Sequence, residues 1–270
     1  MTSLSTPSPL RRTVSAICLA AVLAAGCDTI RDEPGRWTPE RLYAEAKDEA
    51  AIGNWEKAAQ YYERLEGRAA GQVLAEQAQI ERAYALWKAG EKAQALTALE
   101  RFIKLRPSSP AMDYAYYLQG LINFNDNLGL FGSIIGQDLS ERDQQASRDA
   151  YQSFRHLVEQ FPQSTYAEDA RQRMGYIVNV LATYEVHVAR YYFRRGAYVA
   201  AANRAQQTVQ EFQQSPAAEE ALYIMAQSYD RLGLTQLRDD TTRVLQKSFP
   251  QSDIAAHGLG GKASSWWRLW

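Results

Sequence analysis

The stretch that decides the fold is YYFRRGAYVAAANRAQQTVQEF, from Tyr191 to Phe212. Two runs of helix-forming residues meet in it at Gly196, where a tight turn needs a residue that tolerates a positive φ angle. A large residue, Tyr198, follows this glycine by two positions, and a small residue, Ala201, follows it by five. The stretch therefore predicts a pair of helices joined by a glycine turn and packed closely at the alanine.

The same arrangement recurs along the chain. Gly53 also precedes a large residue by two positions and Ala58 by five. The interval from Gly53 to the next turn glycine, Gly90, is 37 residues, and the interval from Gly196 to Gly233 is also 37 residues. Two equal intervals with large and small residues in phase indicate an internal repeat.

A period of this length with two helices per unit resembles the tetratricopeptide repeat. Small residues are expected where paired helices approach most closely, at Ala46 and Ala58, Ala83 and Ala95, Gly120 and Ala150, and Ala189 and Ala201. No single hairpin can bury its apolar face alone, so the units must stack. The sequence predicts an all-α solenoid of about five tetratricopeptide repeats over residues 38–252.

The units differ in detail. Thr38 and Pro39 are suited to begin the first helix, as N-cap and first helical residue. The third unit is longer than the others by an insertion at residues 125–142. In the fourth, Ser164 and Thr165 are candidate caps for a helical pattern that is one extended helix or two joined ones. The fifth is degenerate, as terminal units often are, with Arg238 where a small residue is expected.

The insertion is rich in glycine and carries the apolar pairs Leu130-Phe131 and Ile134-Ile135. A long loop in a compact array is often functional. The alternative is that its apolar residues simply pack back on the repeat.

The first residues have the pattern of a bacterial lipoprotein signal. Arg11 and Arg12 precede an apolar stretch that is too short to span a bilayer comfortably, and it ends in Leu-Ala-Ala-Gly before Cys27. We predict a signal peptide at residues 1–26 and a diacylglyceryl and N-acyl lipid on Cys27. Cys18 is a poorer match because Ile17 precedes it, and the alternative is an ordinary signal peptide with a chance cysteine.

Residues 27–37 are expected to form a lipidated tether, and residues 253–270 a flexible tail rich in Gly and Trp. Asp28 follows the lipidated position and resembles an inner-membrane retention signal of enteric bacteria. The tail ends in a cluster of three Trp and one Leu, a composition suited to membrane interfaces and protein hot spots. The alternative for the tail is a disordered segment.

Composition and motifs argue against an enzyme. The chain has 270 residues and a formal net charge of −1, so a strongly basic nucleic-acid surface is not indicated. His156 and His187 lie in predicted helices without a metal or catalytic motif, and no phosphate loop, nucleophile elbow or dinucleotide fingerprint occurs. We therefore expect no catalytic residue, metal or cofactor other than the covalent lipid, and a function carried by binding surfaces.

The repeats, the lipoprotein signal and the long third unit together resemble the BamD (ComL-like) family of outer membrane assembly lipoproteins. The resemblance is strongest at residues 116–121 (YYLQGL), at residues 161–166 (FPQSTY) with Asp169 and Ala170, and at residues 184–204. It implies a lipid-anchored scaffold on the periplasmic face of the outer membrane. It also implies that the chain helps fold and insert β-barrel proteins.

The resemblance implies three classes of partner: the periplasmic domains of a BamA-like β-barrel insertase, other assembly lipoproteins, and unfolded barrel precursors. N-terminal repeats of the family are thought to receive precursors, so we single out the aromatic residues Tyr43, Trp55, Tyr62 and Tyr84. C-terminal repeats bind the insertase, and the polar pair Asn203 and Arg204 lies in that region. Arg204 can hold a partner carboxylate through paired hydrogen bonds, and the alternative is a solvated helix face.

Two other functions remain open from the residues alone. One is a different periplasmic tetratricopeptide lipoprotein, such as a pilotin or a cell-division coordinator. The other is a peptidoglycan-acting enzyme, which needs a catalytic carboxylate in a cleft, and no motif supports one.

Overall fold

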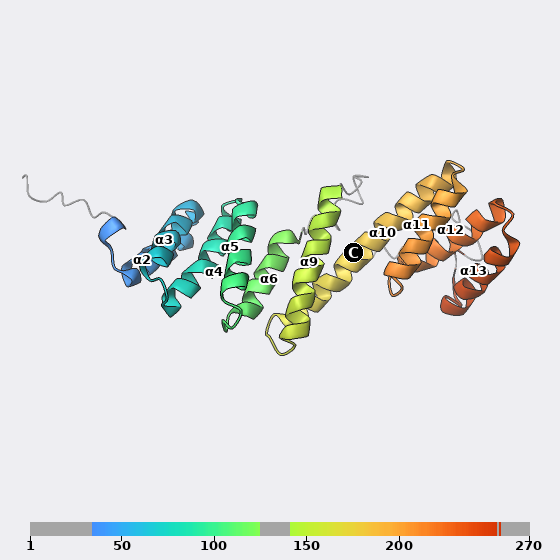
Figure 1. The fold of residues 1–270 in the computed structure, drawn as a ribbon. Helices are drawn as coiled ribbons and strands as arrows, with labels where there is room; N and C mark the ends of the chain where they lie inside the picture. Colours follow the sequence, from blue (N-terminus) through green and yellow to red (C-terminus); the bar gives the residue numbers. More distant parts are fainter. Residues whose placement is uncertain (1–33, 125–140, 253, 255–270) are drawn as a thin grey trace, which may run out of the picture. The chain divides into compact units, whose positions relative to one another are not determined.

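The computed structural model describes residues 34–124, 141–252 and 254. These residues form helices and contain no strand, which confirms the predicted all-α class (Figure 1). After a short 3-10 helix, η1 (Pro34–Arg36), the chain runs through α2 (Pro39–Ala51), α3 (Trp55–Arg68), α4 (Val73–Lys88), α5 (Lys92–Leu105) and α6 (Met112–Asn123). It continues through α9 (Glu141–Gln160), α10 (Ala167–Arg194), α11 (Tyr198–Glu211), α12 (Ala217–Arg231) and α13 (Thr235–Ser248).

The chain divides inside α5 into two compact units, residues 1–98 and 99–270. In the first unit, α2 packs on α3 and α3 packs on α4. In the second unit, α6 packs on α9, and α10 contacts α9, α11 and α12, while α13 packs on α12. Within each unit, these pairs of helices that follow one another in the sequence are neighbours in space, as helical hairpins require.

The predicted start of the first repeat is confirmed. Thr38 is the N-cap of α2, and its Oγ1 accepts a hydrogen bond of 3.3 Å from the backbone N–H of Arg41. Pro39 occupies the first helical position, where its missing N–H is not needed.

The predicted turn glycines have the left-handed conformation that the hairpins need. Gly53, Gly90, Gly196 and Gly233 have φ angles of 82°, 87°, 78° and 72°. A fifth residue of this kind, Gly71 with φ of 84°, joins α3 to α4 and was not predicted. Every positive φ among the described residues belongs to a glycine, because a side chain would clash there.

The small residues predicted at the helix crossings are buried. Seven alanines have no exposed surface: Ala46, Ala58, Ala83, Ala95, Ala150, Ala189 and Ala201. Gly120 is also buried, and a Cβ atom added to it would lie 2.4 Å from the ring of Phe154 on α9. At this crossing the partner fills the space of the missing side chain, so only glycine fits without a shift.

The fourth unit begins with a single long helix, which decides between the two alternatives. α10 has 28 residues and no break. Its first residue is Ala167, and no side chain caps it. Ser164 instead accepts a 3.2 Å hydrogen bond from the Tyr166 N–H and donates one of 2.7 Å to Asp113 on α6.

Several predicted segments fall outside the described residues. They are the signal peptide, the lipidated Cys27, most of the insertion at residues 125–142, and nearly all of the tail at 253–270. The insertion's last two residues, Glu141 and Arg142, belong to α9. The end of the predicted tether packs against α3: Trp37 is buried, its ring lies 5.4 Å from that of Tyr61, and its carbonyl accepts a hydrogen bond from Arg68.

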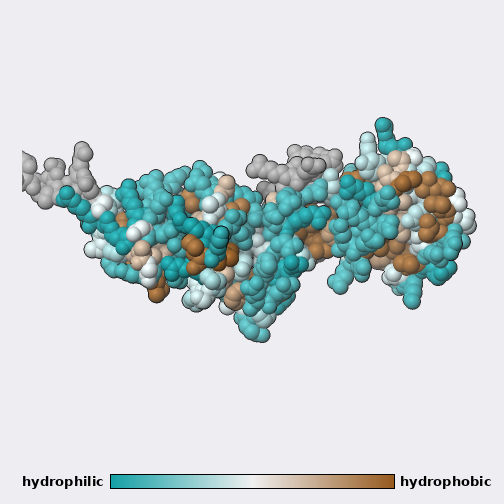
Figure 2. Space-filling view, viewed as in Figure 1, coloured by the Kyte–Doolittle hydropathy of each residue, from teal (hydrophilic) through white to brown (hydrophobic). Residues whose placement is uncertain are grey.

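The fifth repeat, formed by α12 and α13, leaves apolar side chains on its surface. Figure 2 shows a mostly hydrophilic surface with hydrophobic side chains emerging at the end formed by α12 and α13. Leu234, Leu237 and Val244 are between 44% and 48% exposed. Arg238, predicted to make this helix atypical, is partly exposed and hydrogen-bonds to Asp230 and Asp239.

Candidate partner-binding sites

Three of the four aromatic residues predicted to receive a precursor line one pocket in the first unit. Trp55 and Tyr62 reach it from α3, and Tyr84 reaches it from α4. The cavity volume is about 240 Å³, and the remaining lining residues are Lys47, Ala50, Ala51, Glu81 and Ala85. Residues from three helices therefore form one concave site.

Helical spacing explains why these side chains meet. Trp55 and Tyr62 are seven residues apart, about two helical turns, so they share one face of α3. Glu81, Tyr84 and Ala85 share one face of α4 because neighbours on a helix surface are three or four residues apart. Since α3 packs on α4, the two faces come together at the pocket.

The aromatic walls hold one another in edge-to-face contacts. The ring centroids of Trp55 and Tyr84 are 5.8 Å apart at an interplanar angle of 78°, and those of Tyr84 and Trp87 are 5.9 Å apart at 76°. Aromatic rings favour this geometry because the edge of one faces the electron-rich face of the other. Tyr62 is almost fully buried, so it forms the inner wall of the pocket.

Tyr43, the fourth predicted residue, does not line the pocket. Its ring centroid lies 6.1 Å from that of Tyr62, and its hydroxyl accepts a hydrogen bond of 2.6 Å from Nε2 of Gln77. The ammonium of Lys47 lies over its ring at 5.7 Å. Tyr43 thus supports the inner wall from outside.

The pocket contains a carboxylate that the sequence analysis missed. Burial raises the pKa of Glu81, and the charge of Lys47 only partly offsets this effect. Within the described part of the chain, no side chain donates a hydrogen bond to Glu81 or forms an ion pair with it. Its position three residues before Tyr84, on the aromatic face of α4, is the sequence signal that points to it.

The hydroxyl of Tyr62 is affected by the same surroundings. Burial raises the pKa of Tyr62, and the nearby negative charge of Glu81 raises it further. Tyr62 and Glu81 line the same pocket, where the neighbouring side chains partly exclude water.

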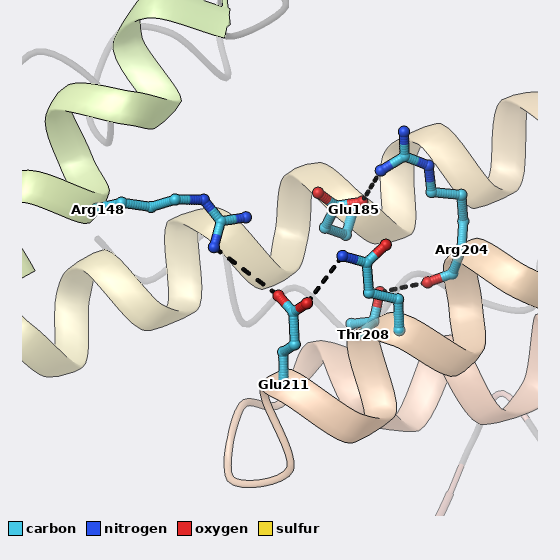
Figure 3. Close-up of polar contacts among 6 residues, drawn as sticks. Arg148, Glu185, Arg204, Thr208 and Glu211 are labelled. Carbon is cyan, nitrogen blue, oxygen red and sulfur yellow. Dashed lines mark hydrogen bonds and ion pairs between the residues drawn. The ribbon is translucent and has the colours of Figure 1, made fainter.

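In the second unit, the structure gives Arg204 an internal partner. Arg204 of α11 forms an ion pair with Glu185 of α10, and Nη1 lies 2.8 Å from Oε2 (Figure 3). The Glu185 side chain is 4% exposed, whereas that of Arg204 is 42% exposed. Arg204 therefore neutralises a buried carboxylate and still shows part of its guanidinium to solvent.

Neighbouring polar contacts extend this site to α9. Arg148 forms an ion pair with Glu211, in which Nη1 lies 3.8 Å from Oε2 (Figure 3). Oε1 of Glu211 also accepts a hydrogen bond of 2.8 Å from Nε2 of Gln207. Thr208 donates a hydrogen bond of 3.0 Å to the carbonyl of Arg204. Ion pairs and hydrogen bonds thus connect α9, α10 and α11 around the predicted insertase contact.

Asn203 differs from its neighbour. It is exposed and makes no hydrogen bond within the described residues. The pair therefore presents an amide without a hydrogen-bond partner among the described residues and a partly exposed guanidinium. Glu185 was not predicted, although a lone acid between Ala182, Val186 and Ala189 signals a buried carboxylate that needs a partner.

Other features add no further site. Within the described residues, no helix is both long and apolar enough to cross a bilayer, and no three His, Cys, Asp or Glu side chains cluster as metal ligands would. His156 stacks on Tyr116, with ring centroids 5.6 Å apart.

Comparison with known proteins gives a consistent result. Residues 36–245 match the model of a family named YfiO and described as outer membrane lipoprotein. The outer membrane protein assembly factor BamD of Neisseria meningitidis serogroup A is 46% identical over 234 residues, which are 87% of this chain and 88% of that protein.

More distant relatives carry the same description. The proteins named outer membrane protein assembly factor BamD from Xylella fastidiosa and Vibrio cholerae are 35% and 33% identical, over 87% and 84% of this chain and 81% and 95% of theirs. Among solved structures, MamA protein aligns with a TM-score of 0.36 at 16% identity, covering 81% of this chain and 93% of that one.

Proposed function

This chain belongs to the YfiO family of outer membrane lipoproteins, and from that membership we propose that it is a lipid-anchored scaffold for assembling outer membrane β-barrel proteins. The observation that carries the proposal is the extent of the match. Residues 36–245 include both candidate binding surfaces, and relatives named outer membrane protein assembly factor align over most of their own length. A stack of helical hairpins supplies extended surfaces of the kind that bind other polypeptides.

We assign the two surfaces different partners. Unfolded barrel precursors bind the first unit at Trp55, Tyr62 and Tyr84, with Tyr43 supporting Tyr62. The periplasmic domains of a BamA-like insertase bind the second unit at Asn203 and Arg204. Arg204 supports this assignment because only one of its guanidinium N–H groups has a partner among the described residues.

The lipid on Cys27 holds the scaffold at the periplasmic face of the outer membrane. Intact-mass analysis of the mature protein should find a chain that begins at residue 27 and carries a diacylglyceryl and an N-acyl group. An unmodified chain cleaved at another position would overturn this part of the proposal.

Affinity purification through a C-terminal tag, in mild detergent and with identification of the partners, tests the scaffold proposal. We expect a β-barrel protein with periplasmic domains and further lipoproteins to co-purify. Recovery of type IV pilus or cell-division proteins instead would favour the corresponding alternative. We propose no catalytic activity, so incubation of the protein with murein should release no fragments.

The insertase contact needs a variant that leaves the buried ion pair intact. Asn203→Ala meets this condition because Asn203 is exposed and forms no hydrogen bond with Glu185 within the described residues. The single variant Arg204→Glu places a second carboxylate beside buried Glu185, so it would disturb the fold as well as the contact. It is therefore compared with the double variant Arg204→Glu with Glu185→Gln, in which the second change removes this repulsion. We expect both Asn203→Ala and the double variant to reduce co-purification of the insertase while the melting temperature stays near that of the wild type.

A further inference from the structure

The pocket in the first unit has a chemical character that aromatic walls alone do not explain. Its volume of about 240 Å³ is below the range of about 300–1,000 Å³ that is usual for drug-sized ligands, so it suits a single side chain. Trp55, Tyr62 and Tyr84 provide aromatic surface, and Glu81 provides a negative charge. We propose that this pocket receives the cationic side chain of an arginine or lysine in a bound polypeptide, with Glu81 as its counter-ion.

The carboxylate is the first support for this inference. A partly buried ionised group without a hydrogen-bond donor is costly, and proteins normally pair such groups. No described side chain forms a hydrogen bond with Glu81, and the charge of Lys47 offsets only part of the effect of burial on the pKa of Glu81. A guanidinium or ammonium group entering the pocket supplies the missing donors and charge.

The aromatic walls are the second support. A cation near the face of Trp or Tyr is attracted by the electron-rich ring. Cations already lie over rings beside the pocket: the Lys88 ammonium is 5.9 Å from the centroid of Trp55, and that of Lys47 is 5.7 Å from that of Tyr43. Of these two rings, Trp55 lines the pocket, so its surface can accept the apolar stem and charged head of a ligand arginine or lysine.

Other occupants fit less well. A purely apolar side chain would bury Glu81 further without giving it a partner, and an acidic side chain would face its negative charge. Lys47 lines the pocket and the Lys88 ammonium lies over the ring of Trp55, and both charges attract an acidic side chain, which is therefore the competing occupant.

This inference rests on the proposal that the first unit binds precursors, and the test separates the two. The probes are labelled synthetic peptides with the C-terminal strand sequence of a β-barrel protein, identical except for one position that is arginine, citrulline or glutamate. Citrulline keeps the shape of arginine and removes its charge. With wild-type protein we expect the arginine peptide to bind at least about tenfold more tightly than the citrulline peptide.

The variant Glu81→Gln should abolish this preference and leave the affinity for the citrulline peptide unchanged. Glu56→Gln is the matched control, because Glu56 is an exposed acid on α3 that does not line the pocket. It changes the net charge equally and should keep the preference. Equal binding of the arginine and citrulline peptides, tighter binding of the glutamate peptide, or a preference retained in Glu81→Gln would overturn the inference.

A second measurement does not depend on precursor binding. Titration with N-acetyl-arginine amide should shift the indole N–H resonance of Trp55, and N-acetyl-citrulline amide should not. If this shift occurs but no peptide binds, the pocket selects cations and the precursor proposal fails. If no shift occurs, the cation inference fails whatever the peptides do.

Discussion

Single residues at helix crossings control the packing of the second unit. A Cβ at position 120 would lie 2.4 Å from Cε1 of Phe154, whose side chain is fully buried. Gly120→Ala therefore forces the ring or the helix to move, and we expect a loss of about 1–3 kcal/mol in the free energy of unfolding. Chemical denaturation followed by circular dichroism measures this.

Gly175→Ala is the matched control for this change. Gly175 lies within α10, is exposed, and has no atom within 4 Å of an added Cβ. Alanine there should stabilise the protein by about 0.5–1 kcal/mol, because glycine is unfavourable inside a helix. If Gly120→Ala were equally stabilising, the close contact with Phe154 would not be present in solution.

Glu81 illustrates a residue whose binding role opposes stability. Burial holds its pKa above the ordinary value of 4.5, so the ionised form weakens the folded state at neutral pH. The destabilisation by ionised Glu81 has its full size above the pKa of the folded state. It becomes smaller as the pH falls through that pKa, and it is absent below the unfolded value of 4.5.

Glu81→Gln should therefore raise the melting temperature at pH 7, and the difference from wild type should vanish near pH 4. Thermal melts between pH 4 and pH 8 check this. A variant less stable than wild type at pH 7 would show that Glu81 has a stabilising partner. The same substitution is expected to remove cation selectivity, so stability and selectivity change in opposite directions.

At the scale of helices, the ion pair between Arg204 and Glu185 joins α11 to α10. Removing one partner of a fully buried pair costs about 3–5 kcal/mol. Arg204 is 42% exposed, so water screens the pair, and we expect Arg204→Ala to lose about 1–3 kcal/mol. Addition of Glu185→Gln should recover much of this loss, which a double-mutant cycle in urea measures. Additive effects would show that the two side chains do not interact.

The two motifs near the middle of the chain, YYLQGL and FPQSTY with Asp169, pack against each other. The Tyr117 hydroxyl donates a hydrogen bond of 2.8 Å to Asp169, and its ring stacks on Tyr166 with centroids 4.7 Å apart. Burial alone would raise the pKa of Asp169, but hydrogen bonds from Arg173 and Tyr117 outweigh it and hold the pKa below 3.8. These contacts tie α6 to the start of α10.

Tyr117→Phe should lower the free energy of unfolding by about 0.5–1.5 kcal/mol above pH 4. Because a depressed carboxyl pKa stabilises the fold above the unfolded pKa, this contribution is lost as the pH falls through the folded pKa. Acid titration should therefore show a smaller difference from wild type at low pH. Tyr223→Phe is the control, since the Tyr223 hydroxyl has no hydrogen bond within the described residues. An equal effect of both changes would contradict the assignment.

At the scale of the whole molecule, anchoring and folding should be separable. The described helices that pack against one another all follow the proposed lipid attachment in the sequence. Cys27→Ala should release the protein from the membrane fraction and leave its melting temperature unchanged. Cell fractionation and thermal denaturation of the released protein check the two parts. Retention in the membrane fraction would show that another segment anchors the chain.

The sequence by itself determined the helical hairpins, their turn glycines, the small residues at their crossings and the family. These features depend on residues close together in the chain, because helix periodicity and the freedom of φ at glycine are local properties. The motifs YYLQGL and FPQSTY could be recognised from the sequence without knowing that they pack against each other. The aromatic residues predicted from the sequence included three that line the pocket.

Only the tertiary structure decided which side chains act together. Tyr43 belongs behind the pocket, Glu81 lies inside it, Phe154 fills the space beside Gly120, and Glu185 holds Arg204. Each of these contacts joins residues on different helices. The sequence of one helix does not specify which other helix will pack against it. Burial then changes their chemistry, because the cost of a charge depends on the water and partners that the packed neighbours leave to it.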